Sequence, residues 1–400
     1  MNQIQKSIYI LLIISYQYLT ADYLAKPYLS NPKTDGITIA WVLKANTDGT
    51  EVHFGETNEY GKRIGITKVD TSDWKRYKLS QVFIHKVQIR GLKPGNQYFY
   101  KVSGGGLPDY ESHFYTISDS PDQEVLMAFG GDYGAAWPDL EDVEYVEKRV
   151  GRPIDFFFDT GDHAIGRRFR AEWQGRIPVI LARGNHDNED KYTSDVGGNG
   201  KPGQVQHYYD FDEDKLNFSF SWGPVFFVVN GSSIYKPIKP KTFKWVEEQY
   251  KHANKPWKIF GCHGVFFTDA SHHQEGPARA KQMWPLFKKY GVQFQFNGHS
   301  HVYYRTHRID ENGDPDPEGT VSCTFGGTNQ GKYWDRPLSK FAAFAYIVEE
   351  RGNGIAYVHF TKDTAQLEFI TRPRKGARKY ELTDSFFLYL RKTADTPAGK

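Results

Sequence analysis

The sequence predicts a two-part fold, in which an N-terminal all-β sandwich is followed by an α/β four-layer domain, a β-sandwich flanked by helices. Short strand-like runs separated by turn signals occupy residues 24–118, and a polar, proline-containing segment follows at residues 118–123. Beyond that segment, short apolar runs alternate with helical patterns, which is typical of α/β sheets. Aromatic residues form 16% of the 400 residues, which favours strands because aromatic rings pack well on pleated faces.

Composition and charge exclude several classes of protein. The formal net charge is +3, so no broad basic field indicates a nucleic-acid partner. The chain has 2 cysteines, too few for a disulfide scaffold or for a cysteine-based zinc finger. Cys262 and Cys323 could pair with each other in a secreted protein, and the sequence leaves that pairing open.

Residues 1–21 are expected to be a signal peptide. Lys6 precedes an apolar run at residues 7–14, which is too short to span a bilayer. A buried first strand or a signal anchor is the alternative. No later run approaches transmembrane length, so we expect no membrane span after the signal is removed. In the secretory route, Asn217 and Asn230 would be glycosylation acceptors because each begins an Asn-X-Ser sequon.

Residues 22–120 are expected to form the first domain. Strands are predicted at residues 37–43, 51–54, 82–89, 97–102 and 113–117, with the spacing of a sandwich. The run from Leu92 to Tyr98 resembles the turn-and-strand signature of fibronectin type III-like domains. No charged or histidine cluster converges here, which favours a structural or docking role.

Residues 121–392 are expected to form the second domain, which carries the chemistry. Helices are predicted at residues 139–151, 242–254 and 278–291, and Pro285 should kink or divide the last one. The predicted strands lie at residues 125–129, 154–158, 177–181, 257–260 and 292–296, and strand-like runs close the domain at residues 344–348, 355–360 and 367–370.

Metal-ligating residue types follow the carboxyl ends of five of these strands, the edge at which sites form in α/β sheets. The set is Asp132, Asp162, Asn185, His263, His299 and His301. Oxygen and imidazole donors suit ions such as zinc, iron and manganese. The set exceeds what one tetrahedral ion takes, so we expect two ions, with a carboxylate such as Asp162 between them. Two ions about 3.5–4 Å apart suit in-line phosphoryl displacement.

This ordered set resembles the calcineurin-like metallophosphoesterases and, within them, the purple acid phosphatases, over residues ~24–390. The resemblance implies a metallophosphoesterase domain behind a fibronectin type III-like one. It implies one metal held by Asp132, Asp162 and His301. It implies a second metal held by Asp162, Asn185, His263 and His299.

The same resemblance assigns the substrate residues. His186 would contact phosphate and protonate the leaving oxygen. His272 and His273 match the paired histidines of the substrate pocket and would assist catalysis, with Glu275 just after them. Asn185 would contact substrate as well as metal.

One position departs from the family pattern. Ile165 stands three residues after the bridging carboxylate, where the family has a tyrosine that ligates iron. We expect a colourless or weakly coloured protein. The expected cofactor is a pair of metal ions, iron with zinc or manganese, and the departure leaves the identity of the pair open.

The function expected from these features is a secreted acid phosphatase, or one of a lysosome- or vacuole-like compartment. It would hydrolyse phosphate monoesters, on phosphorylated small molecules or proteins, by in-line attack of a metal-bound hydroxide. Two alternatives stay open. The first is a phosphodiesterase or nucleotide pyrophosphatase on the same site. The second is a secreted binding protein whose site is weakened by the residue at position 165.

Overall fold

The computed structural model describes residues 22–74, 79–132, 138–162, 172–187, 216–231, 237–269, 276–327, 338–346, 353–372 and 379–390. The expected signal peptide at residues 1–21 lies outside the described residues, as do Ile165, His272, His273 and Glu275. Among the helices that are described, none is long and apolar enough to cross a membrane.

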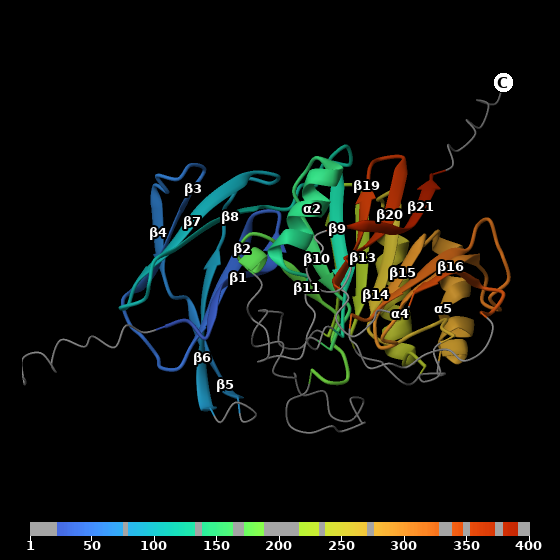
Figure 1. The fold of residues 1–400 in the computed structure, drawn as a ribbon, viewed down its shortest axis with the longest axis horizontal. Helices are drawn as coiled ribbons and strands as arrows, with labels where there is room; N and C mark the ends of the chain where they lie inside the picture. Colours follow the sequence, from blue (N-terminus) through green and yellow to red (C-terminus); the bar gives the residue numbers. More distant parts are fainter. Residues whose placement is uncertain are drawn as a thin grey trace, which may run out of the picture.

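The N-terminal region consists of two antiparallel four-stranded sheets, ordered β1-β2-β6-β5 and β4-β3-β7-β8 (Figure 1). The strands are Ala25–Lys33 (β1), Gly36–Leu43 (β2), Thr50–Gly55 (β3), Lys62–Gly65 (β4), Lys68–Trp74 (β5), Leu79–Ile89 (β6), Gln97–Gly104 (β7) and Tyr110–Tyr115 (β8). All five predicted strands are present. Strand β1 escaped prediction because it contains Pro27 and Pro32, which an edge strand tolerates. The fibronectin type III-like assignment stays a prediction.

The N-terminal region packs directly on the core of the rest of the chain. Every residue of β2 is buried, because the strand is covered on both faces. Trp41 belongs to the core between the two N-terminal sheets, whereas Val42 belongs to the larger core beyond them. The Tyr100 hydroxyl donates to the Gly175 carbonyl across this contact at 2.7 Å. An apolar interface of this kind joins the two parts firmly.

His85 on β6 makes the N-terminal region sensitive to acid. It is fully buried, it stacks on Trp41 with ring centroids 5.8 Å apart, and its Nε2 lies 3.0 Å from Asn46 Oδ1. Burial lowers the pKa of His85 from its ordinary value of 6.5. As the pH falls, His85 is therefore protonated in the unfolded chain before it is protonated in the folded protein. The stabilisation from neutral, buried His85 is present above pH 6.5 and is lost as the pH falls below that value.

We expect the variant His85→Gln to lose less stability between pH 7.5 and pH 5 than the unsubstituted chain, because glutamine does not titrate there. Urea denaturation at the two pH values measures this difference. Equal losses for both proteins would contradict the assignment.

Two further sheets form the second region and lie face to face. The first is ordered β11-β10-β9-β19-β20-β21 and the second β12-β13-β14-β15-β17-β16-β18. Strands of the first are Val125–Gly130 (β9), Phe156–Asp159 (β10), Val179–Leu181 (β11), Asn353–Phe360 (β19), Thr364–Arg372 (β20) and Glu381–Tyr389 (β21). Strands of the second are Asn217–Trp222 (β12), Val225–Asn230 (β13), Trp257–Cys262 (β14), Phe294–Asn297 (β15), Tyr303–Ile309 (β16), Thr320–Phe325 (β17) and Ala342–Tyr346 (β18).

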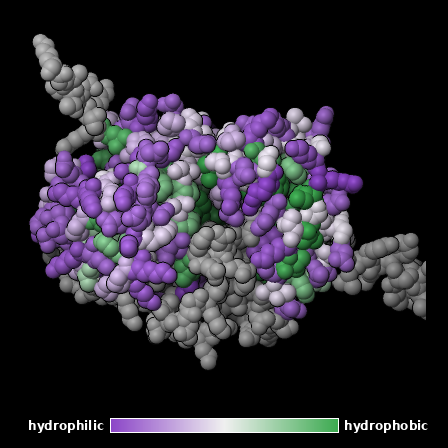
Figure 2. Space-filling view, turned by 180° about the vertical axis from the view of Figure 1, so that it is seen from behind, coloured by the Kyte–Doolittle hydropathy of each residue, from purple (hydrophilic) through white to green (hydrophobic). Residues whose placement is uncertain are grey.

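Aromatic rings fill the space between these sheets. Phe129 of β9 lies 4.5 Å from Phe296 of β15, and Phe158 of β10 lies 4.8 Å from Phe227 of β13, between ring centroids. Figure 2 shows the molecule from behind the view of Figure 1. On this side, hydrophilic residues cover most of the coloured surface, and apolar residues occur in small groups. Many of the aromatic residues are thus buried between the two sheets, and others are buried in the core of the N-terminal region and in the core beneath the helices.

Within the described residues, three α-helices lie against the two sheets. They are Leu140–Val150 (α2), Pro240–His252 (α4) and Gly276–Tyr290 (α5), and a short 3-10 helix spans Glu172–Gly175 (η2). Helix α2 begins after Asp139, whose side chain accepts from the Asp142 N–H, and it ends before Gly151, which has a φ of 81°. Helices α4 and α5 pack on the second sheet, where Phe287 lies 5.1 Å from Phe260. Helix α5 continues through Pro285, so the proline does not divide it, and the alternative of a kink stays a prediction.

The two cysteines are separate thiols. Cys262 lies on β14 and Cys323 on β17, both are buried and free, and β15 runs between them. Two strand spacings amount to about 10 Å. A disulfide needs α-carbons within about 7 Å, so this fold keeps the two apart.

Candidate metal centre

The predicted ligands gather at one edge of the sandwich because the relevant strands are parallel. Strands β9, β10 and β11 are mutually parallel in the first sheet, as are β13, β14, β15 and β17 in the second. The turns after β9 and β10 contact each other, since the Asp132 N–H donates to the Gly161 carbonyl at 2.9 Å. The Gly131 N–H donates to the Phe325 carbonyl at 3.0 Å, which joins the edges of the two sheets.

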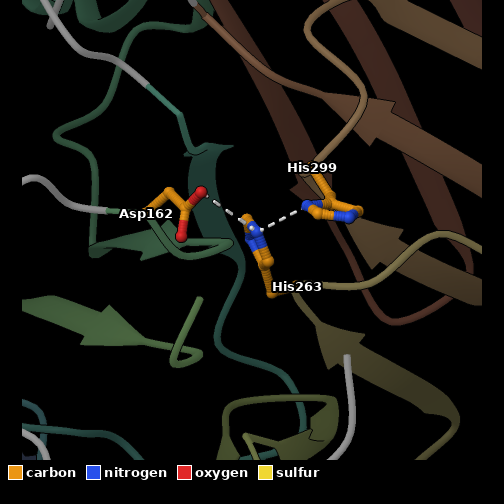
Figure 3. A group of neighbouring side chains, drawn as sticks. All are labelled: Asp162, His263 and His299. Carbon is orange, nitrogen blue, oxygen red and sulfur yellow. Dashed lines mark hydrogen bonds and ion pairs between the residues drawn. The ribbon is translucent and has the colours of Figure 1, made fainter. Parts of the chain in front are cut away.

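Asp162, His263 and His299 point toward one another in this edge (Figure 3). One ligand atom from each lies within 4.8 Å of the others, and all three residues are buried. His263 Nε2 is 3.4 Å from Asp162 Oδ2 and 3.1 Å from His299 Nδ1. The same nitrogen lies 2.9 Å from Asn185 Oδ1. These four residues are the expected second ligand set, and the structure brings them together.

Asp132 and His301 form an adjacent pair. His301 Nε2 lies 3.4 Å from Asp132 Oδ1, and the other carboxylate oxygen accepts the His299 N–H at 2.7 Å. Asp132 Oδ1 is buried and has no hydrogen bond within the described part of the chain. A buried carboxylate oxygen beside an imidazole is a suitable ligand for a second cation.

The backbone at three ligands is strained. Asp132, Asp162 and His299 have φ values of 52°, 55° and 67°, a left-handed conformation that few non-glycine residues adopt. Close packing holds it, since a Cβ on Gly184 would lie 2.2 Å from Asp162 Oδ1. Strain of this kind clusters at functional sites, and here it directs the ligand side chains inward.

A single hydrogen bond sets the tautomer of His263. Its Nδ1 lies 2.8 Å from the Thr160 carbonyl, which can only accept, so this nitrogen carries the proton. The other nitrogen, Nε2, then faces acceptor atoms of Asp162 and Asn185, which are satisfied by a proton on Nε2 or by a cation bound between them. Burial alone would lower the pKa of His263, yet Asp162 and Asp132 raise it to about 10. Burial would likewise raise the pKa of Asp162, but His263 and His186 lower it.

These observations fit a metal centre. Carboxylate, amide and imidazole groups converge in a buried site, and the neighbouring carboxylates favour positive charge there. The donor set is the one that zinc, iron or manganese takes. Asp132, Asp162, Asn185, His263, His299 and His301 are thus suitably placed to hold metal ions.

His186 lies at the outer side of this group. Its N–H donates to Asp162 Oδ1 at 2.7 Å, and its side chain is 52% exposed, with Nε2 3.8 Å from Asp162 Oδ2. A half-exposed imidazole beside the ligands can contact a substrate that approaches from solvent. The other expected substrate residues, His272, His273 and Glu275, lie outside the described residues.

Asp187 is a residue of the site that sequence reasoning missed. It is buried, and its Oδ2 accepts the Asp162 N–H at 3.0 Å and the Gly184 N–H at 2.6 Å. It therefore holds the turn that presents Asp162. Its place directly after Asn185 and His186 was the signal that could have identified it.

We expect the variant Asp187→Ala to weaken metal binding about 10- to 100-fold, because partners that orient ligands contribute that much. The variant Asp187→Asn keeps one acceptor oxygen and should lose less. Titration of the metal-free protein with zinc or manganese measures both affinities. Unchanged affinity in the alanine variant would contradict this role.

One predicted glycosylation acceptor is buried in the folded protein. Asn230 ends β13 and is 1% exposed, so a glycan has no access to its side chain in the folded protein. Asn217 opposes it on β12 and is partly buried. Glycosylation of Asn217 stays a prediction.

Comparison with known proteins decides the family. Residues 71–303 match the model of the calcineurin-like phosphoesterases. The chain belongs to this family. It is similar to a purple acid phosphatase of Glycine max, with 24% identity over 301 residues, 68% of this chain and 63% of that protein. It is similar to the Fe(3+)-Zn(2+) purple acid phosphatase 12 of Arabidopsis thaliana, with 23% identity over 78% of this chain and 74% of that one.

Solved structures share the fold of this phosphoesterase. A purple acid phosphatase from yellow lupin (Lupinus luteus) seeds superposes with a TM-score of 0.69 at 19% identity, over 91% of this chain and 74% of that one. A structure of PhoD gives a TM-score of 0.65 at 12% identity, over 92% and 90% of the two chains. The resemblance to purple acid phosphatases is thereby confirmed, and it supports a phosphoesterase that acts at a metal centre.

Proposed function

We propose that this protein is a secreted acid phosphatase that hydrolyses phosphate monoesters at a dinuclear metal centre. The observation that carries the proposal is the convergence of Asp162, Asn185, His263 and His299 beside the pair of Asp132 and His301. The similarity to purple acid phosphatases supports it. Phosphorylated small molecules or proteins are the proposed substrates, and a secreted or vacuole-like location is proposed with them.

Two bound metal ions would supply a water of lowered pKa and would neutralise charge on the phosphate. Among the residues of the chain, Asp187 and Thr160 hold Asp162 and His263 in place. His186, half exposed next to Asp162, would hold the phosphate and donate a proton to the leaving oxygen. Such proton donation predicts higher activity at acid pH.

Hydrolysis of an aryl phosphate by the purified protein tests the proposal. We expect turnover with added iron, zinc or manganese and none with a chelator. Absence of hydrolysis with every metal would refute the phosphatase. Faster turnover of an aryl phosphodiester would favour the phosphodiesterase instead. Fewer than one bound ion per chain, without hydrolysis, would favour the binding protein.

The metal pair is proposed as iron with zinc or manganese. Metal quantification and a visible spectrum of one native sample test this identity. Ile165 in place of a tyrosine predicts a weak or absent visible band. A strong purple band would contradict that expectation.

A further inference from the structure

One hydrogen bond joins the two expected ligand sets. The His299 N–H donates to Asp132 Oδ2 at 2.7 Å, across 167 residues of chain. Asp132 follows β9 of the first sheet, and His299 follows β15 of the second. Asp132 belongs with His301 in one ligand set, whereas His299 belongs to the other. A side chain of one expected metal position therefore contacts the backbone of a ligand of the other position.

The two carboxylate oxygens of Asp132 have different surroundings. Oδ1 lies 3.4 Å from His301 Nε2 and accepts no hydrogen bond within the described part of the chain. Oδ2 is the atom that accepts the His299 N–H. Since each carboxylate oxygen is an acceptor, Oδ1 can bind a cation beside His301 while Oδ2 keeps its bond to His299.

The turn before His299 is shaped to admit this carboxylate. A Cβ on Gly298 would lie only 2.5 Å from Asp132 Oδ2, and a Cβ on Gly326 would lie 3.1 Å from the same atom. A larger residue at position 298 would push the carboxylate away from the His299 N–H. Glycine thus permits the close approach of side chain and backbone that the hydrogen bond requires.

The conformation of His299 depends on such support. Its φ of 67° is left-handed, and a strained residue of this kind persists only where its surroundings hold it. A hydrogen bond to a carboxylate is among the stronger ones in proteins. Figure 3 shows the His299 ring turned toward His263, and its Nδ1 lies 3.1 Å from His263 Nε2. A rotation of the turn would carry this ring away from the other ligands.

Backbone hydrogen bonds hold the same region without the Asp132 side chain. The Gly131 N–H donates to the Phe325 carbonyl at 3.0 Å, and the Gly327 N–H donates to the Gly131 carbonyl at 2.7 Å. The Gly298 N–H donates to the His263 carbonyl at 3.1 Å. Replacement of the Asp132 side chain should therefore keep the two sheets together and change mainly the orientation of His299.

We propose that Asp132 serves both metal positions, as a ligand of one and as a positioning residue for His299 at the other. Its charge attracts cations to the whole centre, and its hydrogen bond orients a single ligand. This inference rests on the proposed function, because it assumes a dinuclear centre.

The variants Asp132→Asn and Asp132→Ala separate the hydrogen bond from the charge. Both lose the same charge, but asparagine alone keeps a side-chain oxygen that can accept the His299 N–H. Calorimetric titration of the metal-free proteins with zinc measures the affinity of the ion that remains. We expect its Kd to be about tenfold higher in the alanine variant than in the asparagine variant, since partners that orient ligands contribute at least that much.

His301→Ala is the matched control. It removes a ligand from the same position as Asp132 but leaves the carboxylate and its bond to His299 in place. Its remaining ion should bind more tightly than the remaining ion of Asp132→Ala. Asp132→Gly repeats the comparison if the alanine variant fails to fold, because glycine adopts the left-handed conformation of this position, with its φ of 52°, without strain.

Equal zinc affinities of Asp132→Asn and Asp132→Ala would overturn the proposal. A Kd for His301→Ala as high as that of Asp132→Ala would also overturn it, because the loss of a ligand would then explain the whole effect. If the unsubstituted protein binds fewer than two ions, the proposed dinuclear function fails by itself. Hydrogen exchange of the His299 N–H in the metal-free proteins still decides the role of Asp132. We expect faster exchange in Asp132→Ala than in Asp132→Asn, and equal rates would contradict the positioning role.

Discussion

Replacing Asp162 with asparagine is expected to lower kcat for an aryl phosphate at least ~10³-fold, because metal ions contribute several kcal/mol of transition-state stabilisation. Asp162 Oδ2 faces His263 Nε2 at 3.4 Å, and its Oδ1 accepts the His186 N–H at 2.7 Å. Asparagine keeps the size and an acceptor oxygen but loses the charge that attracts a cation. The number of metal ions per chain should fall together with kcat.

Asp155 provides the matched control. It lies directly before β10, at the end of that strand opposite to the end that Asp162 follows. Its carboxylate accepts the Leu126 N–H at 2.7 Å and pairs with Arg152, far along the strand from the ligands. We expect Asp155→Asn to retain its metal ions and kcat. Equal losses in both variants would show that the effect of Asp162→Asn is a general one on folding.

The second large effect is expected on stability, for the variant Asp384→Ala. Asp384 on β21 is buried and accepts Arg305 Nε at 2.7 Å, Arg305 Nη2 at 2.8 Å and the Tyr303 hydroxyl at 2.8 Å. Both partners lie on β16, so this group ties the edge of the first sheet to the second. Removing one member of a buried ion pair costs ~3–5 kcal/mol, since the other charge stays buried.

Urea denaturation of the unsubstituted and variant proteins measures this loss of free energy of unfolding. Asp122→Ala is the control, because Asp122 and Lys362 form an exposed ion pair. We expect no measurable change for that variant, since exposed pairs contribute little. A loss for Asp384→Ala as small as that of the control would show that Arg305 finds another partner.

Much of the fold followed from local sequence signals. The ends of α2 were predicted because Asp139 and Gly151 cap a helix through their own backbone and side chains. The strands before the ligands were predicted because apolar runs end at glycine-containing turns. Strand β1 was missed because its two prolines disguise the strand pattern. The alternative that Pro285 divides α5 was wrong because packing in the apolar core outweighs one proline.

The sequence by itself determined the kind and order of donor atoms, because each donor residue follows a strand that ends at one edge of the sandwich. These residues are Asp132, Asp162, Asn185, His263 and the His299–His301 pair. Only the tertiary structure decided how those donors group. It buried Asn230, set the tautomer of His263 through the Thr160 carbonyl, and joined Asp269 to Tyr304 and Ser339. Thr160 lies 103 residues from His263, and Asp269 lies 35 and 70 residues from its two partners. Contacts over such separations depend on how sheets pack, and no local pattern of residues encodes them.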